Sequence, residues 1–378
     1  MKRVGSGGSG GGFSCILIAA LLLVLGYGGV FFYVFDKGGC EKTPELLQLG
    51  GEIKAQKEEL EILRAELERL KSVPEPTPVV AMQTPVRPGL VVLGMHRSGT
   101  SVIGGLLSQM GLKTGGPLIG AAADNAKGFF ERIDVVLQND YLMRNQKINY
   151  AGSTWKYDHK IGIRDILNDS GTGGKGTFFR EGKRGLAFLN DPGNYPWMLK
   201  DPRLCITLRT WLPVLNFVPA VLFTYRHPMD VALSFLNRYE HFKIARSLIM
   251  WYVYNKRAIQ QSQDLCRVTT SHSLIMTQPL VETDRIFDQL RACGVLVPKK
   301  LTLSEVSNFV DPKLQHGKNA LKDNPCLKDL STLIPPDSWK TVDAGHLTLY
   351  REVIRAFCAM EDGTAYGAGF QWDETIKD

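Results

Sequence analysis

The stretch that most constrains the fold is residues 89–112, which read GLVVLGMHRSGTSVIGGLLSQMGL. It begins with a short apolar run, continues with a polar loop from Gly94 to Gly99, and ends with apolar residues at helical spacing. A strand, a glycine loop and a helix in this order direct backbone N–H groups and a helix N-terminus at one point, which suits a phosphate. The pattern predicts an α/β domain with an anion-binding turn. The alternative is a glycine-rich turn that binds no ligand.

The loop departs from the Walker A motif at one informative position. GxxxxGK[ST] would place a lysine at residue 100, where this chain has Thr100 followed by Ser101. The cation of the loop comes earlier, at Arg97. Hydrolysis of ATP or GTP is therefore disfavoured, and a ligand without a γ-phosphate, which needs no magnesium bridge, is favoured. The loop residues predicted to contact this ligand are Gly94, His96, Arg97, Ser98, Gly99, Thr100 and Ser101.

Residues 220–238 (AVLFTYRHPMDVALSFLNR) repeat the same layout. An apolar run predicts a buried strand, Pro228 marks the loop, and a helix is expected from about Met229. Arg226 follows the strand and Ser234 lies eight residues later, about two helical turns along. An arginine fork and a serine hydroxyl in these positions could hold a second phosphate. The alternative is an ordinary helix start with a surface arginine.

Short apolar runs alternate with helical patterns along the rest of the domain, as βαβ units require. The runs predicted as strands are 90–93, 197–199, 220–225 and 273–276. Their order predicts a central parallel sheet with helices on both faces.

Four ordered segments together resemble the sulfotransferase family. The GMHRSGTS loop is similar to that family's 5′-phosphosulfate-binding loop, and YRHPMDVALSF is similar to its 3′-phosphate-binding segment. NAKGFFERIDVVLQND (125–140) fits the same set, and WMLKDPRLCITLRTWLPVL (197–215) resembles the KDPR segment of bacterial-type members. The resemblance covers roughly residues 90–320. It implies a three-layer, P-loop-like α/β fold and 3′-phosphoadenosine 5′-phosphosulfate (PAPS) as the sulfuryl donor, with no metal required.

Sulfuryl transfer, like phosphoryl transfer, depends on in-line positioning and on charge stabilisation. Arg97 and Lys200 are the candidates to stabilise charge on the sulfuryl group and the departing phosphate, since each follows an apolar strand. The alternative for Lys200 is an ion pair with Asp201.

An acceptor hydroxyl also needs a base. Glu131 is the first candidate because two aromatic residues precede it and glycan-acting members of the family carry a glutamate there. Pairing with Arg132 is its alternative, Asp201 is the second candidate base, and His96 is the third. Gln315, His316 and Lys318 lie in a segment similar to a loop that the family uses near the nucleotide, and an ordinary surface loop is the alternative.

The N-terminal part predicts an anchored layout. Residues 13–35 carry no charge and at a helical rise would span about 34 Å, enough for a bilayer core of roughly 30 Å. Lys2 and Arg3 precede them, so the positive-inside rule places the N-terminus in the cytosol and the rest across the membrane. A cleaved signal peptide is the alternative, although the run is long for one.

Apolar residues at seven-residue spacing then predict a coiled-coil stem that could pair two chains. The alternative is a single solvated helix that acts as a spacer. The two seams are Leu46, Ile53, Leu60 and Leu67, and Leu49, Gln56, Leu63 and Leu70. The predicted order is a cytosolic tail (1–12), a transmembrane signal-anchor (13–35), the stem (36–71), a Pro-rich linker (72–88) and the sulfotransferase domain (89–378).

Composition adds limits on function and compartment. The formal charge of +7 is dispersed, which argues against nucleic acid as a partner. Seven cysteines form no CxxC pair or zinc-like cluster; they can be free thiols, or disulfides if the domain is lumenal. Asn168-Asp-Ser is a glycosylation sequon usable in the same compartment.

These features together predict a Golgi, single-pass type II sulfotransferase with a lumenal catalytic domain. It would sulfate a hydroxyl or amine of a secretory-route acceptor, with a glycan preferred over a peptide, lipid or small metabolite. The alternatives are a P-loop-like nucleotide kinase or NTPase, and a non-catalytic scaffold tethered to the membrane.

Overall fold

The computed structural model of the 378-residue chain describes residues 57, 61, 86–122, 125, 127–167, 180–239, 242–310, 326, 329–335, 339 and 343–378. Residues Gln83–Asp378 form one compact unit. The predicted tail, membrane span, sequon and nearly all of the stem and linker lie outside the described residues. Lys57 and Glu61 of the stem are helical and exposed. Within the described part of the chain, no helix is both long and apolar enough to cross a bilayer.

The described domain is built on a four-stranded parallel sheet with the order β2-β1-β3-β4. The strands are β1 (Gly89–Leu93), β2 (Trp197–Lys200), β3 (Ala220–Tyr225) and β4 (Arg267–Ser271). Val91 of β1 lies opposite Leu199 of β2 and opposite Val221 of β3. Parallel pairing brings the carboxyl ends of all four strands to one edge, where ligands bind in open α/β sheets. The predicted α/β class with a central parallel sheet is confirmed.

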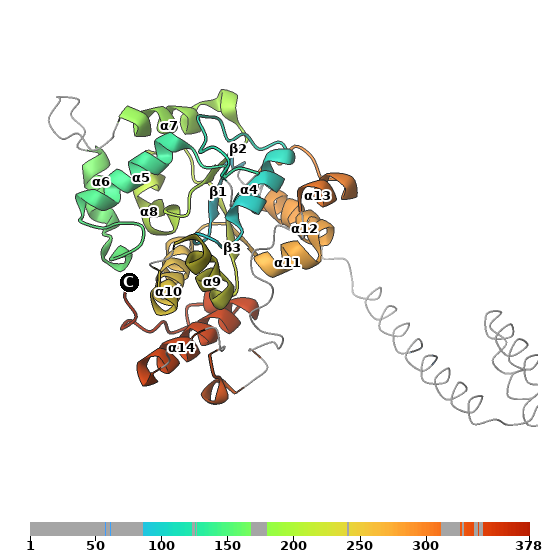
Figure 1. The fold of residues 1–378 in the computed structure, drawn as a ribbon. Coiled ribbons are helices and arrows are strands. Elements are labelled where there is room, and N and C mark those ends of the chain that lie inside the picture. The colour runs from blue at the N-terminus through green and yellow to red at the C-terminus, as the bar shows by residue number, and fades with distance from the viewer. Residues whose placement is uncertain are drawn as a thin grey trace, which may run out of the picture. The chain divides into compact units, whose positions relative to one another are not determined.

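Alternate residues of each strand enter two separate cores, one on each face of the sheet. Val91 and Leu93 of β1 belong to the core covered by α5, α8, α9, α10 and α14, whereas Leu90 and Val92 belong to the core covered by α4, α12 and α13. Figure 1 shows the sheet between these two groups of helices. Because both faces are buried, β1, β2 and β3 are nearly continuous apolar runs rather than alternating ones.

The helices that surround the sheet follow the strands in the order expected for βαβ units. They are α4 (Thr100–Gln109), α5 (Ile133–Asn145), α6 (His159–Leu167), α7 (Arg180–Asn190), α8 (Leu204–Trp211), α9 (Pro228–Arg238), α10 (Ile244–Gln261), α11 (His272–Thr277), α12 (Pro279–Ala292), α13 (Leu303–Phe309) and α14 (Ala344–Glu361).

The prediction of a strand at 273–276 is wrong, because the fourth strand lies earlier, at 267–271. Its sequence, RVTTS, is rich in β-branched residues, which pack well on a pleated surface. The apolar run that follows is part of α11, whose start is fixed by the Ser271 hydroxyl accepting a hydrogen bond from the backbone N–H of Leu274. Ile275 of α11 is buried, whereas Leu274 is 40% exposed. Only one side of this helix therefore packs against the core.

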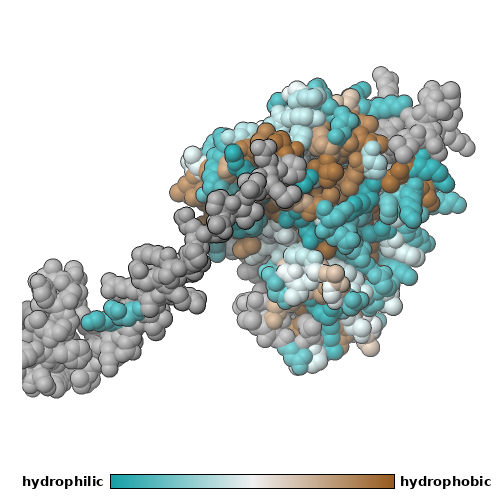
Figure 2. Space-filling model, turned by 180° about the vertical axis from the view of Figure 1, so that it is seen from behind, coloured by the Kyte–Doolittle hydropathy of each residue, from teal (hydrophilic) through white to brown (hydrophobic). Residues whose placement is uncertain are grey.

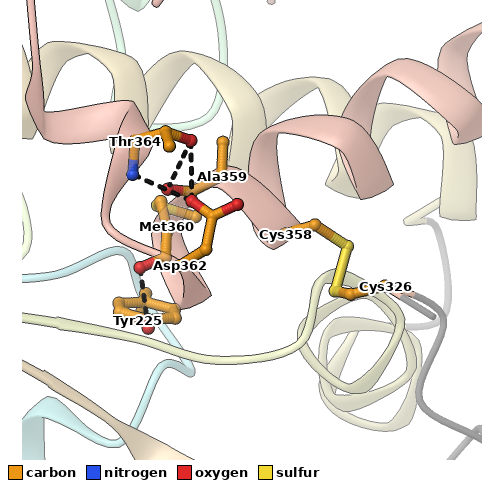
Figure 3. The surroundings of a disulfide bond; sticks show 7 residues. All are labelled: Tyr225, Cys326, Cys358, Ala359, Met360, Asp362 and Thr364. Atoms are coloured by element: carbon orange, nitrogen blue, oxygen red, sulfur yellow. Dashed lines mark hydrogen bonds between the residues drawn. A yellow bond between two sulfur atoms is a disulfide. The ribbon is translucent and has the colours of Figure 1, made fainter.

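The C-terminal helix α14 is joined to the domain covalently and by hydrogen bonds. Cys358 of α14 forms a disulfide with Cys326, and the Tyr225 hydroxyl at the end of β3 donates a hydrogen bond to the Met360 carbonyl (Figure 3). A second disulfide joins Cys266, just before β4, to Cys293 at the end of α12. Among the described cysteines, Cys205 is free and buried.

Removing the Cys266–Cys293 bond in a Cys266→Ala/Cys293→Ala variant is expected to lower the free energy of unfolding by about 3 kcal/mol. The bond closes a loop of 27 residues and so restricts the unfolded chain. Equilibrium unfolding of the compact unit Gln83–Asp378 in urea measures the change. Reducing agent should then destabilise the variant less than the native protein. Equal stability of the two proteins would contradict the bond.

The surface seen from behind carries brown apolar areas among teal hydrophilic ones (Figure 2). Large exposed apolar side chains include Val281 of α12, Leu303 of α13 and Leu296 in the segment between these helices.

Candidate active site

A cavity of about 580 Å³ lies at the carboxyl edge of the sheet, and all four strand ends contribute to it. β2 contributes its last residue, Lys200, and the loop after β1 contributes His96, Arg97 and Gly99. Arg226 follows β3 and His272 follows β4. The other site residues predicted from the sequence that line the cavity are Thr100, Ser101, Glu131 and Ser234.

The loop after β1 makes a tight turn before α4. Gly99, which precedes α4, has φ 85°, a left-handed conformation open to glycine at little cost. Gly94 does not line the cavity; a Cβ there would lie 2.6 Å from the Thr224 carbonyl oxygen, so this glycine allows β3 to pack closely. Ser98 is fully buried, does not line the cavity, and its hydroxyl has no hydrogen-bond partner among the described residues.

The two predicted phosphate-binding segments meet. The Arg97 Nε atom donates a hydrogen bond of 2.9 Å to the Ser234 hydroxyl, and Arg226 donates one of 3.4 Å to the Arg97 carbonyl. Arg226 also lies 3.7 Å from the Asp230 carboxylate. Burial lowers the pKa of Arg226, Asp230 opposes that effect, and the nearby cation Arg97 adds to it. Arg226 is buried and Arg97 is half-buried, and both line the cavity, which suits an anionic ligand.

Lys200 and Glu131 form an ion pair inside the cavity. The Lys200 ammonium lies 2.5 Å from a Glu131 carboxylate oxygen, 3.0 Å from the Phe129 carbonyl and 3.4 Å from the Ser101 hydroxyl. Both charged side chains are less than a tenth exposed. The ion pairs differ from those expected as alternatives: Lys200 pairs with Glu131 rather than with Asp201, and the neighbouring Arg132 pairs with Asp134. The catalytic roles of Lys200 and Glu131 stay predictions.

The other two candidate bases occupy positions that suit structural roles. Asp201 is fully buried outside the cavity, and its oxygens accept hydrogen bonds from Asn139 and from Arg203. His96 lines the cavity, but burial and then the cations Arg203 and Lys200 lower its pKa well below the usual range. His96 is therefore uncharged at neutral pH, and its role as the third candidate base stays a prediction.

Several cavity residues could not be predicted from the sequence. Asn125 donates a hydrogen bond to the Ser101 hydroxyl, and Lys127 donates to the carbonyls of Phe309 and Asn308. These contacts join the segment before Glu131 to α4 and to the C-terminal end of α13. The segment therefore forms one wall of the cavity. The remaining polar lining residues are His272, Tyr150, Arg203, Arg238 and Tyr239.

Gln315, His316 and Lys318 lie outside the described residues, so their proposed contact with a nucleotide stays a prediction. Within the described ranges, no group of three or more His, Cys, Asp or Glu is arranged to hold a metal ion. The cavity residues themselves supply cations and hydroxyl donors at the positions that the sequence predicts for two phosphates.

The buried His272 is expected to make stability depend on pH. Burial, reinforced by Arg226, lowers the pKa of His272 from 6.5 to about 3. Between these pH values the unfolded chain binds a proton that the native protein does not, so the free energy of unfolding falls as the pH drops from 7 to 4. The His272 share of this loss is on the order of 3 kcal/mol. Chemical unfolding across this range should show a shallower pH slope for His272→Asn; an unchanged slope would contradict the assignment.

Comparisons with known proteins find little. No protein-family model matches the chain, and no curated protein sequence matches it significantly. Among solved structures, the chain is similar to the crystal structure of retinol dehydratase in complex with androsterone and the inactive cofactor PAP. The similarity covers 73% of this chain and 82% of that chain, at 12% sequence identity and a TM-score of 0.34. A similarity this distant supports no conclusion about either protein from the other.

Proposed function

We propose that the domain is a sulfotransferase that binds PAPS across the carboxyl edge of its sheet and transfers the sulfuryl group to a hydroxyl or amine. The observation that carries the proposal is the 2.9 Å contact between Arg97 and Ser234. It joins two segments, 137 residues apart in the chain, that resemble the binding sites for the two phosphate-bearing ends of one nucleotide. Further support comes from the cavity in which the two segments meet, because several cations line it.

The residues of the cavity divide into two groups under this proposal. The loop after β1 would hold the 5′-phosphosulfate through N–H groups, hydroxyls and Arg97, and Arg226 with Ser234 would hold the 3′-phosphate. Hydrogen-bond donors that are held in place before the reaction stabilise the charge of the transition state without having to reorganise. This electrostatic effect is usually the largest single contribution to an enzyme's rate.

The Lys200–Glu131 pair would perform the transfer. As the acceptor oxygen or nitrogen forms its bond to sulfur, the bond between sulfur and the 5′-phosphate oxygen breaks. Glu131 receives the acceptor proton, and Lys200 with Arg97 stabilises the negative charge left on the phosphate. The ammonium of Lys200 also fixes the direction of the Glu131 carboxylate through their 2.5 Å contact.

Ligand-dependent stability distinguishes this activity from that of an NTPase. Adenosine 3′,5′-bisphosphate (PAP) at about 100 times its dissociation constant should stabilise the native domain by roughly 2.7 kcal/mol, seen as a higher melting temperature. ATP with magnesium should have a much smaller effect, because the chain has Thr100 where the Walker lysine would be. Stabilisation by ATP alone would reject the proposal.

The lumenal Golgi location and the glycan acceptor belong to the same proposal. The apolar segment 13–35, the heptad stem and the Pro-rich linker support an enzyme held away from a membrane. The disulfides Cys266–Cys293 and Cys326–Cys358 support an oxidising compartment. Full-length protein in microsomes should resist added protease and carry an N-glycan at Asn168 that a glycosidase removes. Digestion of the domain in intact microsomes would reject the lumenal orientation.

A further inference from the structure

A group of four aromatic side chains packs around the chain at Arg226 without lining the cavity. Tyr225 and His227 flank Arg226 in the sequence, Trp251 belongs to α10, and Phe357 belongs to α14. Arg226 itself lines the cavity, and the four aromatic residues do not. Any influence of these four on a bound ligand must therefore act through the residues that they hold in place.

Phe357 contacts the other three members of the group. Its ring centroid lies 4.9 Å from that of His227, 6.2 Å from that of Tyr225 and 6.4 Å from that of Trp251. Trp251 is completely buried, and Phe357 is buried as well. The Tyr225 hydroxyl adds a hydrogen bond to the Met360 carbonyl of α14 (Figure 3). These contacts fix the end of β3 against α10 and α14.

Trp251 contacts the main chain of Arg226 directly. Its indole N–H donates a hydrogen bond of 2.9 Å to the Arg226 carbonyl. β3 ends at Tyr225, so this carbonyl lies beyond the strand, and a buried carbonyl needs a donor. The hydrogen bond therefore fixes the orientation of the peptide group that follows Arg226.

The same peptide group leads into α9, which carries Ser234. Burial lowers the pKa of His227 to about 4, so its ring is uncharged at neutral pH. The ring atom Nδ1 accepts a hydrogen bond of 3.3 Å from the backbone N–H of Met229, in the first turn of α9. The aromatic group consequently holds both the main chain of Arg226 and the start of the helix that carries Ser234.

Holding Arg226 in place matters because its side chain would otherwise have to be ordered when an anion binds. Arginine has many rotamers, and each side chain that binding immobilises reduces the affinity. A binding residue whose direction is set in advance by packing and by a supporting hydrogen bond avoids much of this cost. The hydrogen bond from Trp251 supplies such support at the backbone of Arg226.

We propose, on the basis of the proposed sulfotransferase function, that Trp251 is a positioning residue for the donor nucleotide. It holds the main chain of Arg226 so that the guanidinium is directed at the 3′-phosphate before the nucleotide binds. Trp251 thereby contributes to the preference for a nucleotide with a 3′-phosphate over one without it.

The test replaces Trp251 by phenylalanine, which keeps a buried ring but removes the N–H donor. The full-length protein and the variant are titrated calorimetrically with PAP and with 5′-AMP, well below the melting temperature of either protein. The ratio of PAP affinity to 5′-AMP affinity should fall about fivefold, as expected for the loss of one hydrogen bond. The affinity for 5′-AMP should stay nearly unchanged, because 5′-AMP lacks the phosphate that Arg226 would bind.

Trp197→Phe is the matched control. Trp197 of β2 is also completely buried, its indole N–H donates a hydrogen bond of 2.8 Å to the Leu189 carbonyl, and it does not line the cavity. Both variants should lose stability, because each replaces a large buried ring by a smaller one. Only Trp251→Phe should lose the preference for PAP, which a purely structural role would leave unchanged.

An unchanged ratio in Trp251→Phe overturns the proposal, and so does an equal fall of the ratio in Trp197→Phe. If Trp251→Phe does not fold, Phe357→Leu takes its place. This variant removes the ring that packs on Trp251 and His227, so it should lower the ratio too, and an unchanged ratio there overturns the proposal. Failure of the unaltered protein to bind PAP more tightly than 5′-AMP would instead reject the sulfotransferase function itself.

Discussion

Replacing Glu131 by glutamine is expected to slow sulfuryl transfer about 10²- to 10⁴-fold while leaving the dissociation constant for PAP nearly unchanged. Glutamine has the same shape and can still accept the hydrogen bond from Lys200, so the cavity should keep its geometry. It cannot accept a proton from the acceptor. Single-turnover transfer from ³⁵S-labelled PAPS gives the rate, and calorimetric titration with PAP gives the affinity.

Glu374→Gln is the matched control for this experiment. Glu374 also pairs with a lysine, Lys256, at 2.6 Å, but its side chain is 77% exposed and lies outside the cavity. The control should keep the unaltered rate, because exposed ion pairs contribute little. An unaltered rate in Glu131→Gln would show that another group receives the proton. Asp201 does not line the cavity and is fully buried, so it would not be the first residue to test next.

Replacing Arg226 by alanine is expected to weaken PAP binding by about 30-fold or more, because removing one partner of a buried charge pair costs 2–5 kcal/mol. Arg226 is 7% exposed, and its guanidinium lies against the loop that carries Arg97. Comparing PAP with 5′-AMP isolates the 3′-phosphate: the native domain should prefer PAP strongly, and the variant should lose most of that preference. Isothermal titration with the two nucleotides measures both affinities.

Arg209→Ala supplies the corresponding control. Arg209 forms an ion pair with Asp264 on the surface and does not line the cavity, so the preference for PAP should persist. Arg226→Lys guards against loss of folding, because it retains the charge and should recover part of the preference. If Arg226→Ala kept the native ratio of PAP to 5′-AMP affinity, Arg226 would not bind the 3′-phosphate.

The parts of this domain that could be predicted are those encoded by neighbouring residues. Each of these parts lies within one short segment with a clear pattern of apolar residues. They are the turn after β1, the pair Arg226 and Ser234, and three of the four strands. Parallel strands then bring such segments together automatically, since their carboxyl ends share an edge. This is why Lys200, Arg97 and Arg226 line one cavity although they are far apart in the chain.

The parts that could not be predicted depend on contacts between distant segments. An apolar run of four residues is compatible with either a strand or a helix, so 273–276 was indistinguishable from a strand and His272 was not recognised. The partner of Glu131 is 69 residues away, and the sequence offered only neighbours such as Arg132. Tyr150 belongs to no motif, and the segments that contain Arg203 and Arg238 do not show that these arginines line the cavity. Packing around Phe129 and His96 places all three side chains there.

The backbone of Arg97 has a consequence for engineering this domain. Its φ of 68° is left-handed, a conformation that costs an L-residue with a side chain roughly 1–2 kcal/mol. Asparagine tolerates this region better than arginine does, so Arg97→Asn relieves strain while it removes the guanidinium that reaches Ser234. A screen for heat resistance should therefore favour changes at this position, and the proteins it recovers should melt later and bind PAP more weakly.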